Sequence, residues 1–173
     1  MKIANITKGL LLAFSLSLIT IVSWGQRSPK MEAHGTINGA NLVIKYNAPL
    51  VKGRVIYGGL VPYGKVWRAG ADTATRFYTD KDIKVEGKTL AAGAYSVYAI
   101  PGETEWVIIF NSKTGQWGIN RDGTTTEDPA LDVLRVTVKP RKSATMNENL
   151  AYTFNGKGFV LSWENLEVPV SIK

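Results

Sequence analysis

The fold of this chain is decided by the stretch GAYSVYAIPGETEWVIIF, residues 93–110. Two runs rich in β-branched and aromatic residues flank a Pro101-Gly102 turn, a pattern that predicts two neighbouring strands. The second run, 105–110, is apolar on both faces, which is typical of a central strand covered on both sides. We therefore expect a sheet that has a layer over each of its faces at this point.

Period-two alternation extends outward from this pair along the chain. In the run 131–138, apolar residues occupy one face and Arg135 lies on the other as an exposed strand charge. Asn155-Gly156 between apolar runs is a strong hairpin signal, and Pro169 favours an edge position. Further strands are expected at 41–46, 75–79, 82–86, 150–154, 159–163 and 166–172. No run sustains an apolar period of 3.6, so we predict an all-β fold, an antiparallel β-sandwich of roughly nine or ten strands with one long ordered loop.

The N-terminal residues have the three parts of a secretory signal peptide. Two lysines supply a positive start, a mostly apolar run follows at 10–22, and small residues precede a cleavage site before Gln26. The apolar run is shorter than the about 20 residues of a membrane-spanning helix, and no second run follows it. We therefore predict a signal peptide at 1–25, one domain at 26–173, and a periplasmic or secreted location with no membrane span after cleavage. An uncleaved N-terminal anchor is the alternative.

The composition excludes several kinds of chemistry. The chain of 173 residues has no cysteine, which excludes disulfides, thiol nucleophiles, zinc–thiolate sites and iron–sulfur clusters. Its net charge of +7 is spread along the sequence without a basic block, a distribution typical of a solvated mixed-charge surface rather than of nucleic-acid binding. We therefore expect no cofactor and no nucleic-acid partner.

One segment, Asn47–Ala74, breaks the strand pattern. At about 28 residues it far exceeds the usual connection of four to six, and its aromatic side chains argue against disorder. We expect a compact loop with a helical turn near 60–65 and a buried Trp67 that pins it. The residues expected to shape this loop are Gly58, Gly59, Pro62, Tyr63, Trp67 and Gly70.

The same segment resembles a known family. The motif GRVIYGGLVPYGKVWRAGA at 53–71 is similar to the hallmark of the DUF2911 family, and further similarities at 92–96, 100–102, 105–111, 132–133 and 161–163 extend it over nearly the whole mature chain. The resemblance implies an exported protein of a kind common in Bacteroidota, with a β-sandwich-like domain and no established activity. The family often has Thr, Asn and Glu where this chain has Ala69, Asp72 and Thr73, so chemistry that depends on those groups is not carried over.

Charged side chains of the loop suggest a binding site. Arg54, Lys65, Arg68 and Asp72 can converge, and the planar guanidinium of an arginine suits a carboxylate or a phosphate. The functional interpretation is an anionic-ligand site. The alternative is an internal ion pair between Arg68 and Asp72 that fixes the loop.

Aromatic residues suggest a platform on which sugar rings stack. Trp106 and Trp163 lie in strongly apolar strands, so we expect them in the core. Trp117 lies in a glycine-rich stretch and is the best exposed candidate for ligand binding.

Two other features carry weaker signals. The oxygen-rich stretch 120–132 matches a fragment of a calcium loop, but an ordinary Asp122-Gly123 turn explains it better. His34 is the only histidine, and we expect it at an exposed strand end rather than in a catalytic site. Neither a metal ligand nor a catalytic residue is therefore assigned.

Three functions are compatible with the sequence. We favour a non-enzymatic binding or interaction module of the cell envelope, whose partner is a small molecule, a glycan or an envelope protein. The alternatives are a carboxylate-based hydrolase acting on a saccharide or other polar substrate, and a purely structural envelope protein. A concave pocket lined by Arg54, Arg68, Asp72 and Trp117 would favour a ligand site over the structural role.

Overall fold

The computed structural model describes residues 27–173, so the predicted signal peptide lies outside the described residues. The described part forms ten strands and one turn of 3₁₀-helix, η1 (Pro129–Leu131). None of its helices is long and apolar enough to cross a membrane. The strands are β1 (Lys30–Ile37), β2 (Ala40–Asn47), β3 (Thr75–Thr79), β4 (Ile83–Val85), β5 (Lys88–Leu90), β6 (Gly93–Ile100), β7 (Trp106–Asn111), β8 (Asp132–Val138), β9 (Arg141–Phe154) and β10 (Gly158–Ser171).

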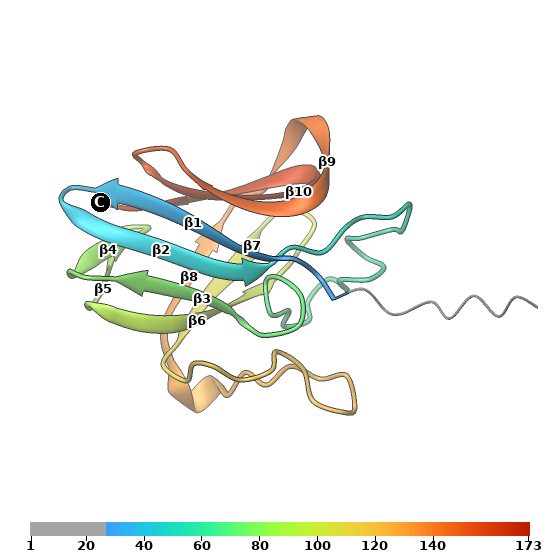
Figure 1. The fold of residues 1–173 in the computed structure, drawn as a ribbon, viewed down its shortest axis with the longest axis horizontal. Coiled ribbons are helices and arrows are strands. Elements are labelled where there is room, and N and C mark those ends of the chain that lie inside the picture. The colour runs from blue at the N-terminus through green and yellow to red at the C-terminus, as the bar shows by residue number, and fades with distance from the viewer. Residues whose placement is uncertain (1–26) are drawn as a thin grey trace, which may run out of the picture.

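Six strands form the main sheet, in the order β1-β2-β3-β6-β7-β8 (Figure 1). Every neighbouring pair is antiparallel. Asn38 and Gly39 join β1 to β2 with positive φ angles of 50° and 78°, as a tight two-residue hairpin turn requires. The stretch 93–110 supplies β6 and β7, which lie inside the sheet rather than at its edge, as predicted.

The second layer is built from two hairpins, β9 with β10 and β4 with β5. Reciprocal backbone hydrogen bonds between Lys84 and Lys173, of 2.7 and 2.9 Å, connect the end of β10 to β4. The two layers make a sandwich rather than a closed barrel. The prediction of an all-β, antiparallel β-sandwich is thus confirmed.

The core lies between the two layers. Alternate residues of the main sheet point into it, so that Leu42, Ile44 and Phe77 are at most 1% exposed. From the second layer, Phe159 of β10 meets Phe77 with their ring centroids 6.1 Å apart. Burying a large apolar side chain stabilises a fold by about 1.5–3 kcal/mol. A core of this kind holds the layers together in a chain that has no cysteine.

A smaller cluster lies on the outer face of the main sheet. Tyr98 of β6 and Ile109 of β7 belong to it, and both are fully buried. The connection between β7 and β8 covers Tyr98, whose hydroxyl accepts a hydrogen bond from Gln116 Nε2 (2.8 Å) and lies 3.2 Å from the Thr126 hydroxyl. The apolar residues on both faces of β7 are therefore covered on both sides, as the sequence predicts.

The last strand differs from the prediction. The pattern predicts separate strands at 159–163 and 166–172, whereas the structure has the single strand β10. Register shifts on both sides of Glu164 explain the break in alternation. Pro169 lies between the last pair with β9, at Glu167, and the hydrogen bond that Ser171 accepts from the Glu86 amide, just after β4. Its missing amide therefore interrupts no ladder, which agrees with the expected edge position.

Candidate functional site

The long loop is anchored to the main sheet by Trp67. The Trp67 amide donates to the Ala99 carbonyl (2.7 Å), and the Ala99 amide donates back to the Trp67 carbonyl (2.8 Å). This bridge continues the ladder in which Thr75 of β3 faces Val97 of β6. The chain thus joins the sheet at Trp67, leaves it, and joins it again at Thr75. The residues between them form an outward loop at the end of the sheet.

The Trp67 side chain packs in an aromatic cluster. Its ring lies nearly parallel to that of Trp163, at 16° and 5.8 Å between centroids, and Trp106 meets it edge-on at 6.3 Å. Tyr57 completes the cluster 5.2 Å from Trp106. Trp106 and Trp163 are at most 1% exposed, as expected of core residues, while Trp67 is half-buried and donates from Nε1 to the Gly70 carbonyl (3.2 Å). The loop is therefore packed against the core.

The interior of the loop differs from the prediction in two respects. Residues 60–65 form turns rather than a helical turn, because the Leu60 amide bonds back to the Val55 carbonyl (3.0 Å). Gly59 permits this reversal, since a Cβ at that position would lie 2.5 Å from the Val55 carbonyl oxygen. Tyr63 is 40% exposed and does not contribute a buried ring.

A second loop, 112–131, lies beside the residues that leave the sheet. The Gly118 amide donates to the Asp72 carbonyl (3.0 Å), and a short hairpin follows in which Ile119 pairs with Thr125. Figure 1 shows this loop, drawn in gold, at the same end of the sandwich as the teal and green segments of the long loop. The two longest connections therefore meet at one end of the molecule.

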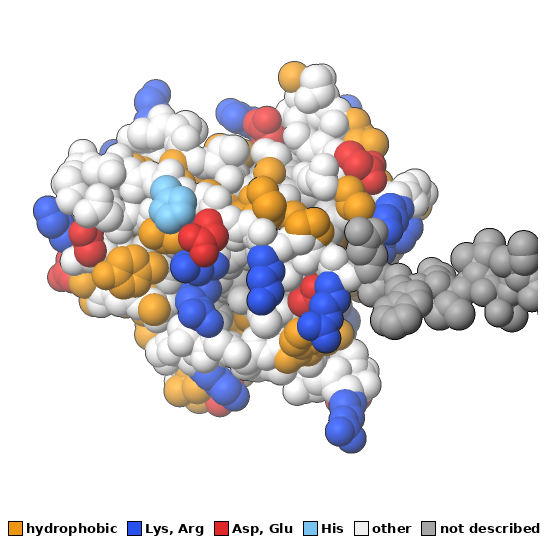
Figure 2. Space-filling model, viewed as in Figure 1, with side chains coloured by type: hydrophobic (Ala, Val, Ile, Leu, Met, Phe, Trp, Pro, Cys, Tyr) orange, Lys and Arg blue, Asp and Glu red, His pale blue; other side chains and the backbone are white. Residues whose placement is uncertain are grey.

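A cavity of about 1030 Å³ lies at this end, lined by both loops and by the start of the described chain. Trp67 and Trp163 form part of its apolar wall. Its charged lining has more cations than acids, and Figure 2 shows several Lys and Arg side chains on the half of the surface where the loops lie. The cationic residues are Arg27, Lys52, Arg54, Lys65 and Arg68, and the acidic ones are Asp72 and Asp122.

The cavity brings together four of the five residues that the sequence suggests for ligand binding, namely Arg54, Lys65, Arg68 and Asp72. Trp117 is 48% exposed, as expected, but it does not line the cavity. The structure places these four residues around one cavity. What they bind stays a prediction.

The side chains of Arg54 and Arg68 make different contacts. Arg54 donates from Nε to the Val51 carbonyl (3.0 Å) and from Nη2 to the Leu50 carbonyl, so its guanidinium fixes the loop at the rim. The stem of Arg68 packs on Gly118, where a Cβ would lie 2.2 Å from Arg68 Cδ. Only a glycine at that position leaves room for the Arg68 side chain as it stands.

The alternative prediction, an internal ion pair between Arg68 and Asp72, is wrong. The ion pairs among the described residues do not include it, and Asp72 instead accepts a hydrogen bond from Asn47 Nδ2 (3.4 Å). Asp72 has a positive φ of 56°, a backbone conformation that residues other than glycine rarely adopt. Burial lowers the pKa of Arg68, and the charge of Asp72 offsets part of this effect.

Hydrogen-bond donors without an acceptor gather around the cavity. Arg68 Nε and Nη1, Trp163 Nε1, Trp106 Nε1 and the Tyr57 hydroxyl are buried and have no hydrogen-bond partner among the described residues. Arg68 and Trp163 line the cavity, and the other two belong to the aromatic cluster. Burial raises the pKa of Tyr57, which keeps its phenol a donor. A buried donor without a partner costs about 1–3 kcal/mol. One buried acceptor in the described part, Gln116 Oε1, also lacks a partner, but it lies outside the cavity lining.

A family model described as "Protein of unknown function (DUF2911)" matches residues 28–172. The chain belongs to the DUF2911 family. No curated protein and no solved structure matches it. The motif at 53–71 that carries the family resemblance contains Arg54, Lys65 and Arg68, so in this DUF2911 domain the most recognisable segment is also part of the cavity wall.

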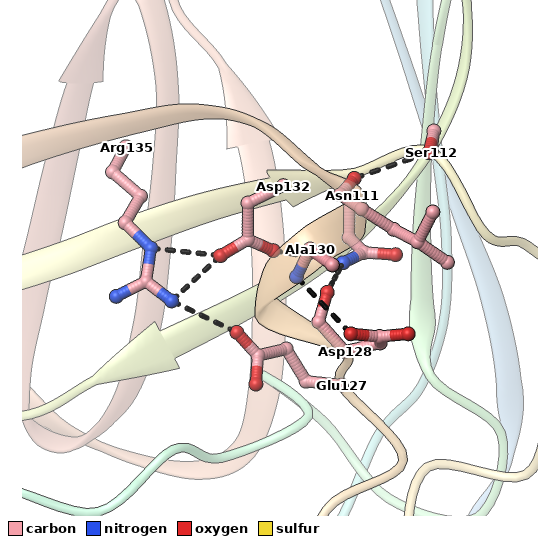
Figure 3. A network of polar contacts seen from close by, with 8 residues as sticks. Asn111, Ser112, Glu127, Asp128, Ala130, Asp132 and Arg135 are labelled. Atoms are coloured by element: carbon pink, nitrogen blue, oxygen red, sulfur yellow. Dashed lines mark hydrogen bonds and ion pairs between the residues drawn. The ribbon is translucent and has the colours of Figure 1, made fainter.

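The DUF2911 domain has a further polar network, which the sequence pattern does not reveal (Figure 3). Arg135 donates to Asp132 Oδ2 (2.7 Å) and to Glu127 Oε1 (2.9 Å), and these two side chains are only 7% and 5% exposed. Asn111 Nδ2 donates to Asp132 Oδ1 (2.7 Å). Burial raises the pKa of Glu127, the charge of Asp132 raises it further, and Arg135 offsets part of the shift. None of these residues lines the cavity.

The network corrects the expectation for Arg135. Its side chain is 44% exposed, but it is not an isolated strand charge because it neutralises two nearly buried carboxylates. Alternation along β8 correctly predicts the face on which Arg135 lies. It does not predict that Glu127, from the preceding loop, contacts Arg135.

The contacts of Asp122 and His34 show how the structure uses the two residues with weaker sequence signals. Asp122 accepts from the Thr124 amide (3.0 Å) and hydroxyl (2.6 Å), as in an ordinary Asp-Gly turn, and no group of three His, Asp or Glu in the described part is arranged to hold a metal. His34 is exposed, as expected, but it lies within β1 opposite Val43 rather than at a strand end. Its Nε2 is 3.3 Å from Glu32.

Proposed function

We propose that this domain is a non-enzymatic binding module of the cell envelope, periplasmic or secreted, that holds a small anionic ligand in the cavity at its loop end. The observation that carries the proposal is Arg68, a cavity-lining arginine with two buried nitrogens, Nε and Nη1, that lack an acceptor. An anion beside this guanidinium would offset the cost of burying its positive charge.

The surrounding charges support an anion rather than a cation. Five cationic and two acidic side chains line the cavity, and like charges around a concave, low-dielectric surface reinforce one another's field. Lys65 lines the cavity and is exposed, so its flexible side chain can reach a bound negative group.

A carboxylate-based hydrolase is less well supported. Asp72 and Asp122 both line the cavity, and hydrolysis by a carboxylate pair requires one of them to remain protonated near neutral pH. Hydrogen bonds from Thr124 lower the pKa of Asp122, which opposes that role. Glu127, whose pKa is raised, lies outside the cavity lining.

A thermal-shift titration tests the proposal. Purified protein is heated with inorganic phosphate, acetate or 3-phenylpropionate, and with glucose as a neutral probe. At 100 times the dissociation constant, a ligand that binds only the folded state stabilises it by about 2.7 kcal/mol. We expect anions to raise the melting temperature, Arg68→Gln to remove this shift, and Arg76→Gln, a change on the exposed face of β3, to retain it.

Two outcomes would contradict the proposal. The first is a melting temperature that no anion changes. The second is an equal shift in the Arg68→Gln variant, which would place the anion elsewhere. A shift with glucose alone would favour a saccharide ligand instead.

A further inference from the structure

The cavity also indicates what kind of anion it takes; the inference rests on the proposed function. We infer that the ligand is an organic acid with one anionic group and an apolar body, and that the acid group faces Arg68 while the body lies against Trp67, Val66 and Leu60. An inorganic ion alone would leave most of the site unfilled.

The size of the cavity supports this inference. Its volume of about 1030 Å³ is at the upper end of the roughly 300–1,000 Å³ of pockets that bury drug-sized molecules. A phosphate or acetate ion needs only a small part of this space. The remaining wall must therefore meet either solvent or a larger ligand.

Part of the cavity wall is apolar. Trp67, Trp163, Val61 and Val66 line the same cavity as Arg68. Leu60 also lines it and is 49% exposed, although its backbone is fixed by the bond to the Val55 carbonyl. An apolar side chain held at the mouth of a pocket offers surface that an apolar ligand body can cover.

The two carboxylates narrow the choice of ligand further. Asp72 and Asp122 line the cavity together with the cations, and hydrogen bonds from Thr124 keep Asp122 ionised by lowering its pKa. A second negative group that lay beside either of these carboxylates would be repelled by it, because like charges at close range oppose binding. A single carboxylate or phosphate meets the cations without this penalty.

Calorimetric titration of the full protein separates these properties with three probes of related shape. 3-Phenylpropionate has the acid and the apolar body, acetate has only the acid, and 3-phenylpropionamide has only the apolar body. We expect 3-phenylpropionate to bind at least about tenfold more tightly than either of the others, since each lacks one of the two recognised parts. Equal dissociation constants for 3-phenylpropionate and acetate would overturn this inference while leaving the proposed anion site intact.

A matched pair of variants locates the apolar contact. Leu60→Ser removes the exposed side chain at the cavity mouth, and Val133→Ser removes one on β8 that is equally exposed at 49% and lies outside the cavity. We expect Leu60→Ser to weaken 3-phenylpropionate about fivefold or more, to leave acetate unchanged, and Val133→Ser to change neither. An unchanged affinity of Leu60→Ser for 3-phenylpropionate would overturn the assignment. Failure of every anion to bind the unmodified protein would instead contradict the proposed function.

Discussion

The interior of the sandwich and its loop end are built from the same kinds of residue but differ in how completely these are satisfied. Between the layers, Phe77, Phe110 and Phe159 pack ring against ring and carry no polar atoms. At the loop end, Trp106, Trp163 and Arg68 have buried N–H groups that lack acceptors. Because buried donors are nearly always paired in folded proteins, the difference indicates that the loop end serves more than stability.

We expect the long loop (47–74) to contribute more to stability than the loop at 112–131. Trp67 pairs with Ala99 and stacks on Trp163, whereas Trp117 is 48% exposed. We expect Trp67→Ala to lower the free energy of unfolding by about 3 kcal/mol or more, and Trp117→Ala by less than about 1 kcal/mol. Urea denaturation measures both. Equal midpoints for the two variants would show that the long loop is not part of the packed core.

A smaller effect is expected at the carboxylate network. Arg135→Ala leaves Glu127 and Asp132 nearly buried without their cation, whereas Arg141 pairs with a more exposed Glu167. We expect Arg135→Ala to cost about 1–2 kcal/mol and Arg141→Ala less than about 1 kcal/mol. The same denaturation assay tests this, and a loss at Arg135 no larger than at Arg141 would return Arg135 to the status of a surface charge.

The smallest effect concerns pH. The pKa of Glu127 is raised above its ordinary value of 4.5, so the folded state binds this proton more tightly than the unfolded state and the contribution of Glu127 to stability declines as pH rises through the raised pKa. The unfolding free energy of the unmodified protein, relative to Glu127→Gln, should therefore fall as pH rises above 4.5.

Asp80→Asn is the control for this measurement. Hydrogen bonds from Asn41 lower the pKa of Asp80, so its contribution is complete above the ordinary value of 3.8 and is lost only as pH falls below it. The difference in unfolding free energy between the unmodified protein and Asp80→Asn should stay constant over the pH range in which the corresponding difference for Glu127→Gln changes. A Glu127→Gln difference in unfolding free energy that does not change with pH would contradict a raised pKa of Glu127.

Much of the fold can be predicted from the sequence because apolar alternation records which side of a strand is buried. It predicts β2, β3, β6, β7 and β8 closely. It does not reveal β1 or the first half of β9, whose residues are mostly polar or exposed and whose pairing depends on neighbours far away in the chain. The bulge at Glu164 likewise breaks the pattern without ending the strand.

The candidate site can be predicted only in part. The glycines and aromatics of the long loop indicate a packed segment, and its charges indicate where Arg54, Lys65, Arg68 and Asp72 come together. The contribution of the hairpin around Asp122, the packing of Arg68 on Gly118 and the unpaired donors depend on contacts between loops about fifty residues apart, and no local pattern specifies them.

The most direct measurement of the central claim is a titration followed by nuclear magnetic resonance of the side-chain N–H groups. 3-Phenylpropionate is added to isotopically labelled protein, and the Nε signals of the arginines and tryptophans are recorded. We predict that Arg68 Nε and Trp163 Nε1 shift with a common dissociation constant while Trp117 Nε1 and Arg141 Nε do not. Shifts confined to Arg141, or no change at Arg68 under saturating ligand, would contradict an anion site at the loop end.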